Sequence, residues 1–182
     1  MKKKILIIVS AAAVCVIAFC ILVLTGVIQF KSGNEELVKG KALCYVKYMD
    51  TYMLLDKNNV VTGSTTECPE NLPEISGVSF DSIIVGKKFE PKDEAPYKYA
   101  LKLVDCFKKN SLGVSEVYVA DDMKATVYVA KVKILMGVDE NTEEKINDLR
   151  DFYDDLIQLE GTLDMQELSK NNIGYSFRQN KK

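Results

Sequence analysis

Two adjacent aspartate pairs are the best candidates for chemistry in this sequence, Asp121-Asp122 and Asp154-Asp155. Neighbouring carboxyl groups can divide the roles of general acid and general base between them. The first pair lies in a predicted tight turn and the second on the polar face of a predicted helix. Carboxylates in such places are usually solvated. We therefore expect both pairs to be surface groups without a catalytic role.

The 182 residues include no histidine, which removes most other catalytic arrangements. Ser-His-Asp and Cys-His nucleophiles, His-ligated zinc and imidazole acid–base chemistry all require that side chain. The glycines are isolated and no Cys-x-x-Cys pair occurs, so phosphate loops and thiolate metal sites are not predicted either. The lysines are scattered, and none lies in an apolar context that would lower its pKa strongly. We expect a protein that is not an enzyme, without catalytic residues, metal, cofactor or small-molecule substrate.

Three cysteines follow residue 42, namely Cys44, Cys68 and Cys106. Because the number is odd, at least one of them is free or bonded to another chain. A Cys44–Cys68 disulfide is conceivable, but burial as small hydrophobic side chains is the simpler interpretation.

A charge-free segment over residues 5–30 predicts one transmembrane helix. At about 1.5 Å per residue it is long enough to cross the ~30 Å hydrocarbon core of a bilayer. A cleaved signal peptide is the alternative, but its apolar region is normally ~7–15 residues long and is followed by a small-residue cleavage site. The lysines at positions 2–4 favour a cytoplasmic N-terminus. We expect a cytoplasmic tail over 1–4, a linker over 31–42 and a domain outside the cytoplasm.

The charge of the chain argues against a nucleic-acid partner. Three of the 24 basic residues are the lysines at positions 2–4, so the rest of the chain carries five more acidic than basic residues. No basic stripe is visible in that part of the sequence. A mildly acidic domain has no electrostatic reason to bind nucleic acid.

Hydrophobic periodicity after residue 42 predicts one domain of the α+β class. Period-two alternation predicts strands, and apolar residues at three- and four-residue steps predict helices. Because the connections are short, we expect a mainly antiparallel sheet with two packed helices behind the transmembrane helix. The predicted strands are 43–49, 52–55, a return strand from 60 after a turn at Asn59, 114–120, 125–130, 132–137 and 173–178, and residues 72–77 are predicted to lead into a short extended segment. One helix is predicted over 97–110, with a buried face of Tyr97, Ala100, Leu101, Val104 and Phe107. A second is predicted over 142–160, ended by Gly161, with a buried face of Ile146, Leu149, Phe152 or Tyr153, Leu156 and Leu159.

The last predicted strand is the strongest candidate for a binding site. A strand at the end of a chain often lies at a sheet edge, where unpaired backbone groups can accept a partner strand. In this segment Ile173, Tyr175 and Phe177 alternate with Gly174, Ser176 and Arg178. The alternative is an ordinary paired strand whose apolar residues belong to the core.

Five short segments are notable for their order along the chain, namely Tyr52–Val61, Leu72–Gly77, Val132–Gly137, Glu144–Ile146 and Leu163–Met165. In this order they resemble the extracytoplasmic β domain of the FtsQ/DivIB cell-division family. The resemblance covers residues 43–178, and residues 179–182 are a short tail. That family carries a POTRA domain of ~70 residues between anchor and β domain. Here the linker is about a dozen residues, so we expect that domain to be missing.

The resemblance implies a non-catalytic scaffold of the divisome at the division septum. In the family, the C-terminal strand pairs with the FtsB/DivIC subunit, which is associated with FtsL. By position, the implied partner-binding residues are Ile173, Gly174, Tyr175, Ser176, Phe177 and Arg178. Two other hypotheses remain. One is a membrane-tethered binding or sensor module of sporulation or envelope stress, and the other is a carboxylate-dependent cell-wall hydrolase.

Overall fold

A computed structural model describes residues 42–166 and 174–180 of the chain. The transmembrane helix expected over 5–30 lies outside these residues. Within the two described ranges, no helix combines the length and the apolarity that a membrane crossing requires. For residues 42–166 and 174–180, the fold class is corrected to one α+β domain with a nine-stranded mixed sheet and two helices.

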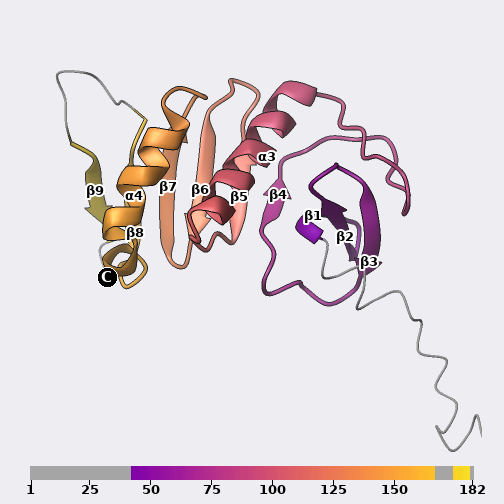
Figure 1. The fold of residues 1–182 in the computed structure, drawn as a ribbon, viewed down its shortest axis with the longest axis horizontal. Helices are drawn as coiled ribbons and strands as arrows, with labels where there is room; N and C mark the ends of the chain where they lie inside the picture. Colours follow the sequence, from indigo (N-terminus) through magenta and orange to yellow (C-terminus); the bar gives the residue numbers. More distant parts are fainter. Residues whose placement is uncertain (1–41, 167–173, 181–182) are drawn as a thin grey trace, which may run out of the picture. The chain divides into compact units, whose positions relative to one another are not determined.

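The nine strands form one sheet in the order β3-β2-β1-β4-β5-β6-β7-β8-β9, with β3 and β9 at its edges (Figure 1). Helix α3 follows β4 in the chain, and helix α4 follows β7. The strands are β1 Ala42–Tyr48, β2 Thr51–Asp56, β3 Val61–Thr65, β4 Glu74–Ser76, β5 Glu116–Val119, β6 Ala125–Val129, β7 Val132–Gly137, β8 Gly161–Asp164 and β9 Ser176–Gln179.

The prediction of a mainly antiparallel sheet overlooked the parallel pairs that make this sheet mixed. Strand β4 pairs in parallel with both β1 and β5, and β7 pairs in parallel with β8. The physical reason lies in the connections. Helix α3 links β4 to β5 and helix α4 links β7 to β8, and a helical crossover returns the chain to the starting end of the sheet.

Helix α3 spans Glu94–Lys109, close to the predicted 97–110. Its start is capped by Asp93, whose carboxylate accepts a hydrogen bond from the Ala95 N–H at 3.1 Å. Its buried face includes the expected Tyr97 and Phe107. The buried leucine, however, is Leu103, whereas Leu101 was predicted.

Helix α4 spans Thr142–Leu156 and is one turn shorter than predicted. Ile146, Leu149 and Leu156 are buried as expected. Leu159, expected in the buried stripe, lies beyond the helix and is 39% exposed. The last turn tightens there, since the Leu159 N–H donates to the Leu156 carbonyl at 2.9 Å. The helix therefore ends before Gly161, the residue predicted to stop it.

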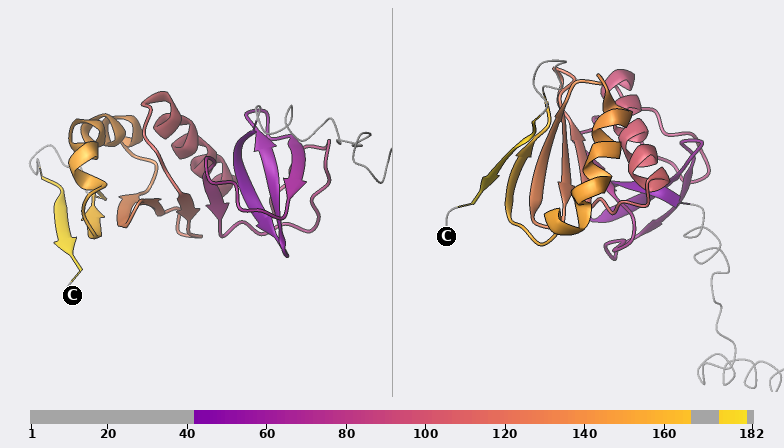
Figure 2. Two further views of the ribbon diagram at one scale, coloured as in Figure 1. Left: turned by 90° about the horizontal axis from the view of Figure 1, so that it is seen from below. Right: turned by 60° about the vertical axis from the view of Figure 1, so that its left-hand side comes forward.

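Both helices lie on the same face of the sheet (Figure 2). Alternate residues of the strands point into the core between sheet and helices, as Val117 and Val119 of β5 and Val127 and Val129 of β6 show. The intervening residues lie on the other face, where exposure is greater. We call this second face, over strands β4–β9, the open face.

Candidate functional site

The two aspartate pairs lie apart and on the surface. Asp121 and Asp122 form the exposed turn after β5, and Asp122 bonds Lys124 at 2.7 Å. This ion pair lowers the pKa of the Asp122 carboxyl, which makes it a poor proton donor. Asp154 and Asp155 are exposed on α4. The prediction that both pairs are surface groups is confirmed.

One lysine is buried, which the scattered pattern of lysines in the sequence did not indicate. Lys145 of α4 is 1% exposed, and burial lowers the pKa of its ammonium group. Its Nζ donates to the Met136 carbonyl at 2.7 Å and to the Gln166 carbonyl at 3.1 Å. Lys145 therefore joins helix α4, strand β7 and the segment after β8. Because both acceptors are backbone carbonyl groups, these hydrogen bonds give Lys145 a structural role.

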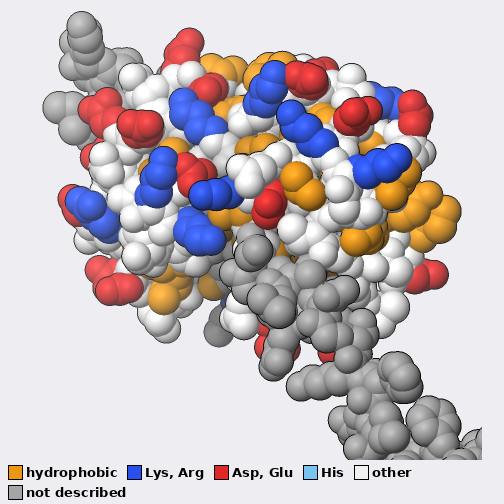
Figure 3. Space-filling model, turned by 45° about the vertical axis from the view of Figure 1, so that its right-hand side comes forward, with side chains coloured by type: hydrophobic (Ala, Val, Ile, Leu, Met, Phe, Trp, Pro, Cys, Tyr) orange, Lys and Arg blue, Asp and Glu red, His pale blue; other side chains and the backbone are white. Residues whose placement is uncertain are grey.

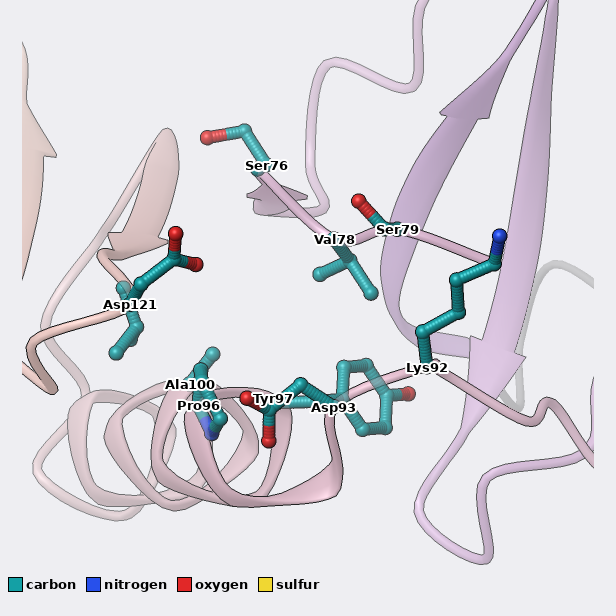
Figure 4. Close-up of a pocket in the computed structure, with 11 residues that line it drawn as sticks. Ser76, Val78, Ser79, Lys92, Asp93, Pro96, Tyr97, Ala100 and Asp121 are labelled. Carbon is teal, nitrogen blue, oxygen red and sulfur yellow. The ribbon is translucent and has the colours of Figure 1, made fainter. Parts of the chain in front are cut away.

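A small cavity lies at the start of α3 (Figure 4). Its volume is about 60 Å³, room for about two water molecules and far below the ~300 Å³ of a typical ligand site. Asp93 and Asp121 line it from two different elements. Lys92 turns its amine away from the cavity in Figure 4 and bonds Asp81 at 2.6 Å. This cavity offers no substrate site.

The three cysteines of the described residues are all free thiols. Cys44 and Cys106 are buried, and burial raises the pKa of the Cys44 thiol to about 12. Such a thiol is a poor nucleophile at neutral pH. Burial as small hydrophobic side chains is confirmed for these two residues. Cys68 is exposed, so it does not follow that prediction, and no Cys44–Cys68 disulfide is formed.

The last strand, β9, is an edge strand of the sheet. It pairs with β8 on one side, antiparallel, through the register Thr162–Arg178 and Asp164–Ser176. No other strand of the described residues lies on its outer side. Gly174 and Tyr175 precede the strand, Ser176, Phe177 and Arg178 lie within it, and Ile173 is outside the described residues. The edge position is as predicted, whereas the binding role stays a prediction.

The backbone of β8 divides its hydrogen bonds between its two neighbours. Gly161 and Met165 donate toward β7, to the carbonyls of Lys131 at 3.4 Å and Leu135 at 2.9 Å. On the other side, the Asn180 N–H donates to the Glu160 carbonyl at 3.2 Å. Even-numbered residues of β8 therefore bond β9.

The same alternation identifies the free groups of β9. Arg178 and Ser176 lie opposite Thr162 and Asp164, so their backbone N–H and C=O groups point toward β8 and bond it. The backbone N–H and C=O groups of Phe177 and Gln179 then point outward, away from β8. These are the groups that an added strand would pair with.

Side chains hold β9 against helix α4. The Tyr175 hydroxyl donates to the Asp148 carboxylate at 2.5 Å, and its ring lies 6.4 Å from that of Phe152. Burial and this carboxylate raise the pKa of the Tyr175 phenol. Phe177 also contacts the core, whereas Arg178 is exposed on the open face. The apolar residues of β9 therefore orient the strand and leave its backbone edge uncovered.

The opposite edge of the sheet is partly covered. Val60 forms a bridge with Lys88, and the Val61 N–H donates to the Lys87 carbonyl at 2.9 Å. The Phe89 N–H donates to the Asn59 carbonyl, also at 2.9 Å. This segment occupies the start of β3, so β9 is the more accessible of the two edges.

Basic and acidic side chains are interspersed on the face seen in Figure 3. Neither sign of charge gathers there into a continuous patch. This face offers no uniform basic surface of the kind that attracts a phosphate backbone.

Comparison with known proteins gives no assignment. No protein-family model matches the sequence, and no curated protein matches it significantly.

Proposed function

We propose that this chain is a non-catalytic scaffold of the bacterial cell-division complex, located outside the cytoplasm at the division septum. It binds a divisome subunit of the FtsB/DivIC type, which is accompanied by an FtsL-type subunit, by adding a strand to the open edge of β9. The assignment to the FtsQ/DivIB family is part of this proposal.

One observation supports the binding mode above all others. The outward backbone groups of Phe177 and Gln179 have no partner strand among the described residues. The N–H and C=O groups of an added strand that face β9 would gain partners there, which gives affinity and fixes the register. The resemblance of five ordered segments to the FtsQ/DivIB family supports the choice of partner.

Proline at position 179 tests the binding mode. Gln179→Pro removes an N–H that points away from β8, so the β8–β9 ladder keeps its bonds while the added strand loses one and meets the proline ring. Gln179→Ala is the matched control, because it alters the same exposed side chain and keeps the N–H. We expect co-purification of the FtsB/DivIC-type subunit to fall about tenfold for the proline variant, the loss of about one well-made hydrogen bond. The alanine variant should behave as wild type.

A photo-crosslinking residue at position 179 tests the partner in growing cells. Position 179 is exposed, whereas the half-buried Tyr175 contacts α4 and would be a poorer site. We expect capture of the FtsB/DivIC-type subunit at mid-cell. Capture of a sporulation or envelope-stress protein would refute the division assignment and leave the edge site standing. Normal co-purification of the proline variant would refute the edge site itself.

A further inference from the structure

The open face carries one continuous row of polar side chains across six strands. Strand register aligns one residue from each of the strands β4–β9, and neighbouring strands lie ~4.8 Å apart, so the row is about 24 Å long. Along its strand each member is next to at least one residue that is buried or packs against the core, which puts the row on the side away from the helices. In order, the row is Glu74, Glu116, Tyr128, Lys133, Thr162 and Arg178.

Charge is divided along this row. Glu74 and Glu116 occupy one end, and Lys133 and Arg178 lie toward the other. None of these four side chains takes part in an ion pair among the described residues, although several other surface charges do. The two glutamates accept only hydroxyl hydrogen bonds there: Tyr45 to Glu74 at 3.4 Å, and Ser76 to Glu116 at 2.5 Å.

The two glutamates lie next to each other in the register of β4 and β5. Burial and the neighbouring Glu116 charge both raise the pKa of the Glu74 carboxyl. A cation placed over this end would relieve the repulsion, and an anion placed over the other end would neutralise Lys133 and Arg178. The row therefore calls for a partner whose charges run in the reverse order.

We propose that the open face binds a second copy of this chain. The two copies are related by a two-fold axis that runs parallel to the strands, between β6 and β7. Rotation about this axis places the row of the second copy, in reverse order, opposite the row of the first. Glu74 then faces Arg178 of the second copy, and Tyr128 faces the second copy's Lys133. These are an ion pair and a cation–π contact, and the symmetry forms each of them twice.

The neighbouring row obeys the same symmetry. It consists of one residue from each strand, in the order Ser76, Tyr118, Thr126, Leu135, Asp164 and Ser176. Reversal places Tyr118 over Asp164 of the second copy, so its hydroxyl can donate to a carboxylate. Tyr118 is 40% exposed, which makes it one of the large apolar side chains that such a contact would cover. Thr126 faces the second copy's Leu135.

The contact is small and charged. Four residues per strand at ~3.3 Å give the face a width of about 13 Å. With the row's length of about 24 Å, the area of the face is smaller than the ~800 Å² that each partner of a stable dimer usually buries. Association is therefore weak, depends on protein concentration and falls with added salt. The β9 edge stays free, because its outward backbone groups lie in the plane of the sheet. Dimerisation and strand addition are thus separate properties.

Charge reversal in two separate variants tests the symmetry. Glu74→Lys alone places the introduced lysine opposite Arg178 of the other copy, so two contacts between positive charges form in the dimer. Arg178→Glu alone places the introduced glutamate opposite Glu74 of the other copy, so two contacts between negative charges form. Mixed together, the variants pair the introduced lysine with the introduced glutamate, and the native Arg178 with the native Glu74. Only a face that is reversed on itself behaves in this way.

Sedimentation of the purified full chain over a range of concentrations is the measurement. We expect each variant to dimerise about tenfold more weakly than wild type, and the one-to-one mixture to recover wild-type association. Lys57→Glu, in the exposed turn before β3, is the control and should have no effect. Circular dichroism verifies that each variant is folded. A wild-type chain that stays monomeric at the highest concentration, or a mixture no better than its components, would overturn the proposal.

Discussion

The first residue of β8 has no space for a side chain. A Cβ at Gly161 would overlap the Arg178 carbonyl oxygen, and it would lie 2.8 Å from Phe177 Cζ and 3.0 Å from Gln179 Cα. Carbon atoms in contact prefer ~3.5–4.0 Å, so β9 must move outward by about 1 Å. We expect Gly161→Ala to separate β9 from β8 and to leave the other strands paired.

The cost of this change can be bounded. Overpacking a well-packed site lowers the free energy of unfolding by roughly 1–3 kcal/mol. For a domain of this size, each 1 kcal/mol lowers Tm by about 3–5 °C. The melting temperature of Gly161→Ala should therefore fall by roughly 3–15 °C.

Hydrogen exchange locates the damage within the sheet. The amides of Ser176 and Arg178 point toward β8, so their exchange should accelerate in Gly161→Ala, while the amides of β6 keep their protection. Gly174→Ala is the matched control, because a Cβ at that position meets nothing within 4 Å. Wild-type exchange and melting in Gly161→Ala would show that β9 does not pack on β8 as described.

Three further predictions concern single side chains. Tyr175→Phe removes the hydrogen bond to Asp148 and should lower the free energy of unfolding by about 0.5–1.5 kcal/mol in urea titrations at pH 7. Because the pKa of the phenol is raised in the folded state, this difference in stability from wild type should shrink above pH 10. The lowered pKa of Lys145 means that the unfolded chain binds more protons in alkaline solution. Wild-type stability relative to Lys145→Met should therefore rise as pH increases toward 10.5, and a flat difference would contradict this. The raised pKa of Glu74 means that the folded state disfavours its ionised carboxyl, so Glu74→Gln should be more stable than wild type at pH 7 in dilute solution. This difference in stability should disappear below pH 4.5, where Glu74 is protonated in both folded and unfolded wild type.

Local pattern was sufficient to predict most of the elements. The apolar spacing from Tyr97 to Phe107 predicted helix α3, and the alternation of Val132, Ile134 and Met136 predicted strand β7. Asn59, read as a residue of a left-handed turn, has φ +64°. These predictions succeeded because a helix or strand with one buried face repeats its apolar residues at the period of its own backbone.

Pairing and burial could not be read from the same patterns. The short strand β4 was predicted only as an extended segment, and its parallel pairing with β5 depends on where helix α3 returns the chain. Lys145 lies on a helical turn that looks polar, and it is buried because carbonyls from β7 and from Gln166 converge on its amine. Such contacts join residues far apart in sequence, and no local period encodes them.

The candidate site divides in the same way. Sequence alone determined that the last segment is an alternating strand, with Tyr175 and Phe177 on one side and Ser176 and Arg178 on the other. Only the tertiary structure decided that this strand is at an edge and that Phe177 and Gln179 present the free backbone groups. The physical reason is that side-chain alternation belongs to each strand, whereas hydrogen-bond direction is set by the neighbour that the strand pairs with.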